Sequence, residues 1–160
     1  MHDFDGITPT IANVRPTSRG EINIASKDSR DNPKIKMNYL STQDDRDVAA
    51  KALKIVRNIM LNTKTFKKYE PEEYRPGIHI TDNEELVQAG SEHTQTIFHP
   101  VGTCKMGNDE SAVVSDKLKV HGLNKLRVVD ASIMPNITSG NTNAPTIMIA
   151  EKGADMILSS

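Results

Sequence analysis

A histidine and an asparagine, far apart in the chain, could together carry out acid–base chemistry on a hydroxyl group. His99 precedes a proline, and because a residue before proline favours extended backbone, we expect it at a strand end. Asn143 comes two residues before Pro145, where an apolar run typical of a helix begins. A neutral imidazole can take a hydroxyl proton near neutral pH, and an amide can orient the same oxygen. We therefore interpret His99 and Asn143 as a candidate catalytic pair facing one cavity; the alternative is a structural histidine and a helix-capping asparagine.

The composition indicates one soluble domain without a charged polymer as partner. The 160 residues include 20 Lys and Arg against 21 Asp and Glu, a net charge of −1. This balance gives no reason to expect nucleic acid or an anionic membrane surface as partner. Cys104 has no second cysteine to pair with, which favours a reducing compartment, and no apolar run has the length of a membrane span. We expect a cytoplasmic protein.

Other kinds of site are weaker candidates. Two glycines have P-loop spacing, but Asn108 stands where that loop requires lysine, and no G-x-G-x-x-G is present. His93, His99, His121 and Cys104 lack zinc-ligand spacing, so we expect no metal site. A thiol hydrolase that uses Cys104 with His121 stays open, although a single cysteine is more often a small buried apolar residue.

The first half of the chain predicts an antiparallel sheet followed by helices. Residues 8–15, 21–26 and 35–39 have strand-like patterns, so we expect strands with one face covered. Apolar residues then recur at helical spacing from about residue 44 to residue 62. A capping box at residues 81–84 predicts a second helix that ends near residue 93.

The second half predicts a buried strand and a nearly all-apolar helix. Residues 126–130 read as the strand, and Asp130 with the two residues after it lies where open sheets often bind ligands, although turn chemistry explains these residues equally well. Residues 145–158 leave only a narrow polar edge, which indicates a helix buried on several sides by a neighbour. The N-terminus of this helix would favour an anion or an electron-rich ring.

Several of these segments closely resemble the C-terminal part of the glucose–methanol–choline (GMC) oxidoreductases, with choline dehydrogenases and related acceptor-dependent alcohol dehydrogenases as the most similar members. The matching segments are residues 15–20 (RPTSRG), 38–40 (NYL), 99–107 (HPVGTCKMG), 120–123 (VHGL), 126–135 (LRVVDASIMP) and 140–146 (GNTNAPT). The resemblance covers essentially the whole chain and is most specific over residues 98–152.

The resemblance implies an FAD-dependent oxidation of a primary alcohol, choline-like or other, to the aldehyde. His99 would take the hydroxyl proton while a hydride passes to the flavin, and Asn143 would hydrogen-bond the substrate oxygen. The residues implied to lie against the cofactor are Phe98, Asp130, Ala131, Asn143, Ala144, Pro145 and Thr146.

The resemblance also implies an α+β fold in two parts. Residues 1–125 would form part of a substrate-binding domain, an antiparallel sheet with flanking helices. Residues 126–160 would return to the flavin-binding domain as its last strand and C-terminal helix.

The main FAD-binding unit of the family, with its glycine fingerprint, is missing from this sequence. We therefore expect an incomplete enzyme that needs an N-terminal FAD domain in cis or in trans. The alternative is a truncated, inactive or partner-docking module without catalysis of its own. The electron acceptor, oxygen or a membrane quinone, stays open, and a quinone would make the protein membrane-associated.

Overall fold

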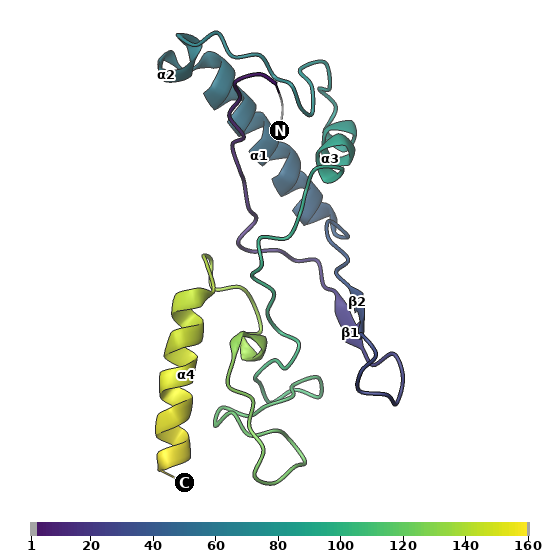
Figure 1. Ribbon diagram of the computed structural model, residues 1–160, viewed down its shortest axis with the longest axis vertical. Coiled ribbons are helices and arrows are strands. Elements are labelled where there is room, and N and C mark those ends of the chain that lie inside the picture. Colours follow the sequence, from purple (N-terminus) through teal and green to yellow (C-terminus); the bar gives the residue numbers. More distant parts are fainter. Residues whose placement is uncertain (1–2, 160) are drawn as a thin grey trace. The chain divides into compact units, whose positions relative to one another are not determined.

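The protein is described by a computed structural model over residues 3–159, which divide into two compact units (Figure 1). The first unit contains residues 3–13 and 39–95, and the second contains residues 14–38 and 96–159. Short antiparallel strands together with helices make the α+β fold that the sequence predicted.

The first unit is helical: α1 (Gln43–Asn62), α2 (Lys64–Lys67) and α3 (Asn83–Ser91). Both predicted helices, one long and one short, are confirmed, and the second ends two residues earlier than expected. The N-cap of α3 is Asp82, whose carboxylate accepts hydrogen bonds from the N–H groups of Glu84 and Glu85, so the predicted capping box is wrong by one position. In residues 3–159, no helix is long and apolar enough to cross a membrane.

Helices α1 and α3 pack against each other, and Ala50 of α1 and Leu86 and Val87 of α3 are buried. A largely buried ion pair fixes the loop between α2 and α3. Arg57 donates to both carboxylate oxygens of Glu73, at 2.6 and 2.9 Å, and also to the carbonyl oxygens of Gly77 and Ile80. Because each nitrogen of this guanidinium donates to an acceptor, directional polar contacts hold the loop between α2 and α3.

The second unit begins with a hairpin of β1 (Glu21–Asn23) and β2 (Lys34–Lys36), in which Ile22 pairs with Ile35. The predicted strands are therefore shorter than expected, and residues 8–15 form no strand. All six strand residues are exposed, so the prediction of one covered face is wrong. Alternation sets which side chains share a face of a sheet, but burial requires a second layer, and residues 3–159 supply none over this hairpin.

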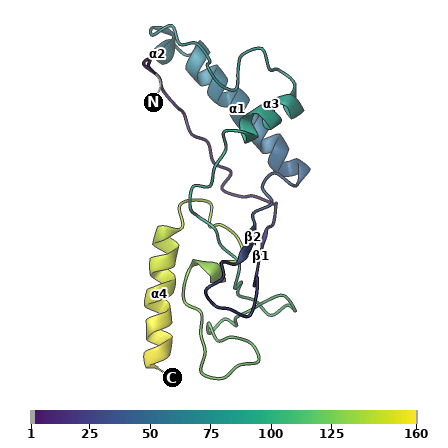
Figure 2. The same ribbon diagram turned by 45° about the vertical axis from the view of Figure 1, so that its right-hand side comes forward.

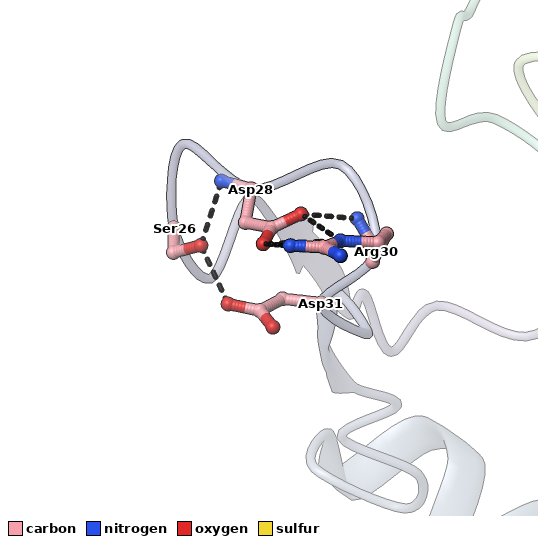
Figure 3. A network of polar contacts seen from close by, with 4 residues as sticks. All are labelled: Ser26, Asp28, Arg30 and Asp31. Atoms are coloured by element: carbon pink, nitrogen blue, oxygen red, sulfur yellow. Dashed lines mark hydrogen bonds and ion pairs between the residues drawn. The ribbon is translucent and has the colours of Figure 1, made fainter.

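Polar contacts hold the loop of this hairpin (Figure 3). Asp28 accepts hydrogen bonds from the backbone N–H and the guanidinium of Arg30, which lower the pKa of the Asp28 carboxyl. Ser26 contacts Asp31 at 2.6 Å and accepts from the N–H of Asp28. These groups lie in solvent, so they shape the loop without a large stabilising effect.

The core of the second unit lies between α4 (Asn143–Leu158) and the segments that precede it. α4 runs beside the 3₁₀ helix η1 (Ala131–Ile133), as both ribbon views show (Figure 2). The buried apolar residues of this core are Val114, Leu118, Ile133, Met134 and Ile149. The predicted buried strand at residues 126–130 is wrong: only Arg127 forms a single bridge, with Lys119, and Leu126 is exposed. An apolar run can fill a core as irregular chain when it finds no strand to pair with.

Two arginines hold the loop that leads into α4. Arg19 donates to the side-chain oxygen of Asn136 at 2.6 Å, and Arg15 donates to the hydroxyl of Ser139. Both arginines precede β1, so a segment far away in the sequence fixes the approach to α4. The position of this loop therefore depends on side-chain hydrogen bonds and not on the backbone hydrogen bonds of a sheet.

Gly153, buried in α4, should be essential to this packing. A Cβ at this position would lie 2.4 Å from the Val129 Cγ1 atom. We expect Gly153→Ala to destabilise the protein by about 1–2 kcal/mol, because overpacking exceeds the gain in helix propensity. Denaturant unfolding measures the effect. Gly140→Ala is the control, since nothing lies within 4 Å of its Cβ. Equal stability of the two variants would contradict the predicted close packing.

Removal of the Arg19 side chain should loosen the loop before α4. We expect Arg19→Ala to increase hydrogen exchange at residues 136–142 by several-fold, because the loop loses its bond to Asn136. Arg30→Ala is the matched control, since Arg30 bonds only within the hairpin loop. Peptide-resolved exchange by mass spectrometry compares the two. Unchanged exchange in Arg19→Ala, or an equal rise in the control, would show that Arg19 does not hold this loop.

Candidate active site

His99 lies in irregular chain that is fixed to η1 by backbone hydrogen bonds. The N–H of Cys104 donates to the carbonyl oxygen of Ser132 at 3.0 Å, and that of Met106 donates to Ile133 at 2.8 Å. His99 is not at a strand end, so that prediction is wrong. Pro100 has no N–H with which to extend a ladder, and Phe98 has a φ of +61°.

A glycine makes the turn that follows His99. Gly102 has a φ of +90°, where any other residue would be strained, and a Cβ there would lie 3.4 Å from the carbonyl oxygen of Met134. The N–H of Lys105 donates back to the Gly102 carbonyl oxygen. Gly102 thus lets the chain turn close to the core. His99, which precedes this turn, is half-buried.

The imidazole of His99 is anchored at the beginning of α4. Its Nδ1 atom lies 2.9 Å from the hydroxyl oxygen of Thr142, a side chain that is only 7% exposed. Thr142 is the residue directly before Asn143. The two predicted catalytic residues are therefore brought to the same end of the same helix, with Thr142 as the link between them.

Asn143 is the first residue of α4 and not its cap, so the helix begins two residues earlier than predicted. Thr142 occupies the N-cap position, but its hydroxyl makes no capping bond. Asn143 and Ala144 are exposed, whereas Pro145 and Thr146 are half-buried. The N–H groups of Asn143 and Ala144 receive no side-chain cap, so this end of α4 keeps its partial positive charge.

The other predicted cofactor residues have mixed surroundings. The Asp130 carboxylate caps η1, accepting from the N–H of Ser132 at 2.8 Å and from the Ser132 hydroxyl. Ala131 packs on the core, and Phe98 is 80% exposed. Ordinary capping thus accounts for the visible bonds of Asp130, and a contact of these residues with a cofactor stays a prediction.

The shared cavity expected for His99 and Asn143 also stays a prediction. Two open pockets, of about 280 and 470 Å³, lie in the first unit, where Arg46 and Glu84 help to line both. The alternative sites stay predictions as well. His121 Nε2 lies 3.1 Å from the carbonyl oxygen of Gly107, so its ring is engaged by backbone. No cluster of metal-ligating side chains occurs in the part of the chain that is described.

A strongly perturbed carboxylate ends the turn after the motif glycines. The Asp109 side chain accepts from the Ser111 hydroxyl at 2.6 Å and from Lys105 at 3.1 Å, and these contacts lower the pKa of Asp109 to about 2. Any stability that it supplies is present above its ordinary pKa of 3.8 and is lost as the pH falls through about 2. The group is therefore an acceptor at neutral pH and fixes the turn.

Sequence reasoning missed three residues that shape this region: Thr142, Arg15 and Arg19. Arg15 and Arg19 lie in a matching segment, but nothing in the local pattern tells which distant loop they bind. Thr142 had one usable signal, its position directly before Asn143. Its bond to His99 depends on the tertiary fold.

Comparisons with known proteins show the family to which this chain belongs. The family model described as GMC oxidoreductase matches residues 16–150. The oxygen-dependent choline dehydrogenase of Proteus mirabilis is 48% identical over 97% of this chain, which spans 28% of that protein. That of Pectobacterium carotovorum is 47% identical over 95% of this chain and 27% of its own length. The chain thus spans about a quarter of the length of these relatives.

Solved structures give the same result. Pyridoxine 4-oxidase from Mesorbium loti superposes with a TM-score of 0.85 at 35% identity, over 92% of this chain and 28% of that one. An Aspergillus oryzae formate oxidase variant gives a TM-score of 0.83 at 32% identity, over 91% and 26%. The sequence motifs, the fold and the family match all coincide over most of the described residues. The chain belongs to the GMC oxidoreductase family.

Proposed function

We propose that this chain is the C-terminal part of an FAD-dependent oxidoreductase that oxidises a primary alcohol, choline or a similar one, to the aldehyde. The observation that carries the proposal is the position of His99, held 2.9 Å from Thr142 at the N-terminus of α4, next to Asn143. A titratable imidazole, an amide and a positive helix end in one place suit the removal of a hydroxyl proton. The names of the choline dehydrogenase relatives support the substrate class.

The residues present fit one end of FAD and not the whole cofactor. The uncapped first turn of α4 and the exposed Phe98 ring offer N–H groups and an apolar face for the flavin ring. We assign Phe98, Asp130, Ala131 and residues 143–146 to this contact. No glycine-rich dinucleotide motif occurs in the sequence, so the ADP half would be held by an FAD domain outside it. When bound, FAD supplies the acceptor for the two electrons of the alcohol.

The mechanism of this chain is proton transfer and charge stabilisation. The Nε2 atom of His99 takes the proton from the substrate hydroxyl, because Nδ1 is engaged by Thr142. The Asn143 carboxamide donates to the substrate oxygen and orients it. The positive end of α4 stabilises the negative charge that develops on this oxygen as the proton leaves.

The domain assignment is part of the same proposal. Residues 1–125 would belong to the substrate-binding domain of the longer protein, and residues 126–160 to its flavin-binding domain. In the structure, residues from both segments share one core: Val114 and Leu118 pack with Ile133 and Ile149. The assignment therefore describes a junction at which the two domains meet, with His99 and Asn143 on opposite sides of it in the sequence.

The relatives are oxygen-dependent choline dehydrogenases, which favours oxygen as the final electron acceptor, and oxygen needs no membrane contact. A quinone acceptor would place the protein at a membrane surface, whereas oxygen fits a cytoplasmic protein.

A binding module without its own catalysis is the second candidate. α4 exposes large apolar side chains, namely Ile147, Met148, Ile157 and Leu158, and an exposed apolar patch often marks an interface. The two candidates differ in one test. A docking module would support the activity of a separate FAD domain even when His99 is replaced, whereas an active-site segment would not.

We expect His99→Ala to lower kcat/KM for alcohol oxidation by about 10²–10⁴-fold in the longer enzyme that includes the FAD domain, because the proton acceptor is lost. Oxygen consumption or dye reduction with choline and simple primary alcohols measures it. His121→Ala is the matched control, since its exposed ring bonds only a backbone carbonyl. Turnover in His99→Ala close to that of the unmodified protein would end the assignment of His99 as the base.

A further inference from the structure

We propose that Thr142 is a positioning residue for His99: its hydroxyl fixes the tautomer and the orientation of the imidazole so that Nε2 faces the substrate. This inference rests on the proposed function of His99 as the base. The contact that carries it is the 2.9 Å approach of the Thr142 hydroxyl to His99 Nδ1, within one compact unit of the structure.

The position of Thr142 makes its hydroxyl available for this role. A threonine at an N-cap normally accepts a hydrogen bond from the first helical turn, as Thr42 does from the N–H of Asp45 in α1. Thr142 stands at the same position of α4 but has φ −85° and ψ −3°, which is helical and not extended backbone. Its hydroxyl therefore makes no cap and turns to His99 instead.

The surroundings of Thr142 hold this hydroxyl in place. The side chain is 7% exposed, and the backbone carbonyl of Thr142 accepts from the N–H of Thr146 at 3.0 Å and from its hydroxyl at 2.6 Å. The residue is thus fixed by helix α4 on its C-terminal side. Because this buried hydroxyl is held in a fixed position, its 2.9 Å contact with Nδ1 holds the imidazole to one ring orientation.

Two arrangements satisfy the observed distance, and only one of them suits a base. When the Thr142 hydroxyl donates to Nδ1, the proton of the neutral ring lies on Nε2, and Nε2 cannot accept another. When Nδ1–H donates to the hydroxyl oxygen, the Nε2 lone pair is available. The second bond also survives proton transfer, because Nδ1 carries its hydrogen in both the neutral ring and the imidazolium. The ring then needs no reorientation during the reaction.

The first test reads the tautomer directly. In protein labelled with ¹⁵N-histidine, the nitrogen shifts of the neutral ring at alkaline pH report which nitrogen carries the hydrogen. We expect the Nδ1–H form for His99 in the unmodified protein and a shift towards the Nε2–H form in Thr142→Val. Val keeps the shape of Thr and removes only the hydroxyl, and the helix loses no cap. An Nε2–H form in the unmodified protein, or no change in the variant, would overturn the proposal.

The second test reads activity with a rescue. We expect Thr142→Val to lower kcat by about tenfold, the effect of one hydrogen bond, with little change in KM. Thr142→Ser restores the hydroxyl and should restore both the tautomer and most of kcat. Thr138→Val, with an exposed side chain in the loop before α4, is the matched control and should change neither. Equal activity in Thr142→Val and the unmodified protein would overturn the proposal.

The two tests separate this inference from the proposed function. The ¹⁵N shifts of the neutral ring do not depend on turnover, so they report the link between Thr142 and His99 even in protein without activity. A tautomer that depends on Thr142, combined with full activity in His99→Ala, would refute the role of the base and leave the hydrogen bond standing. A tautomer independent of Thr142, with activity lost in His99→Ala, would refute only the positioning role.

Discussion

The close packing of α4 on the core of the second unit is the constraint on which the candidate site depends. Ile149 and Gly153 form the buried face of this helix, and Gly153 lies so close to Val129 that a single methyl group would not fit. Because a helix is rigid over one or two turns, this contact fixes where the first turn begins. The position of Thr142, and through it the position of the His99 ring, follows from how deeply α4 sits against its neighbours.

The chain around the site uses few regular hydrogen-bond ladders and many individual contacts. The segment that carries His99 is bound to η1 by two backbone hydrogen bonds and turned by Gly102, while Arg15 and Arg19 hold the loop that leads into α4. Such contacts are directional, so each fixes the chain at one point. This manner of construction suits the proposed site, in which two side chains from distant segments would contact one oxygen atom.

Large apolar side chains remain exposed on both the hairpin and α4, including Ile24 and Leu158. This chain spans only 26–28% of the length of its relatives, which are almost four times as long. In a protein of that length, further residues could cover these side chains. Because α4 is nearly all apolar, we expected it to be buried on several sides. Within residues 3–159, only one face of the helix is buried. The most apolar helix of the chain is therefore also the surface at which we expect further protein to pack.

The sequence by itself determined the elements and the chemistry that are local in origin. Helical periodicity predicted α1, and a capping signal predicted α3, each to within two residues, because both features depend on near neighbours along the chain. The family was recognised from the resemblance of the motifs around His99 and Asn143 to known proteins. Strand-like alternation was less reliable, since the covered face predicted for residues 21–39 requires a partner layer that alternation cannot reveal.

Only the tertiary structure decided how the distant segments meet. It replaced the predicted strand at residues 126–130 by irregular chain packed under α4, moved the start of α4 to Asn143, and joined His99 to Thr142. None of these can be read from local preference, because each depends on the burial of side chains from segments far apart in the sequence. Side chains from remote segments become buried and form their hydrogen bonds together, when the whole chain folds.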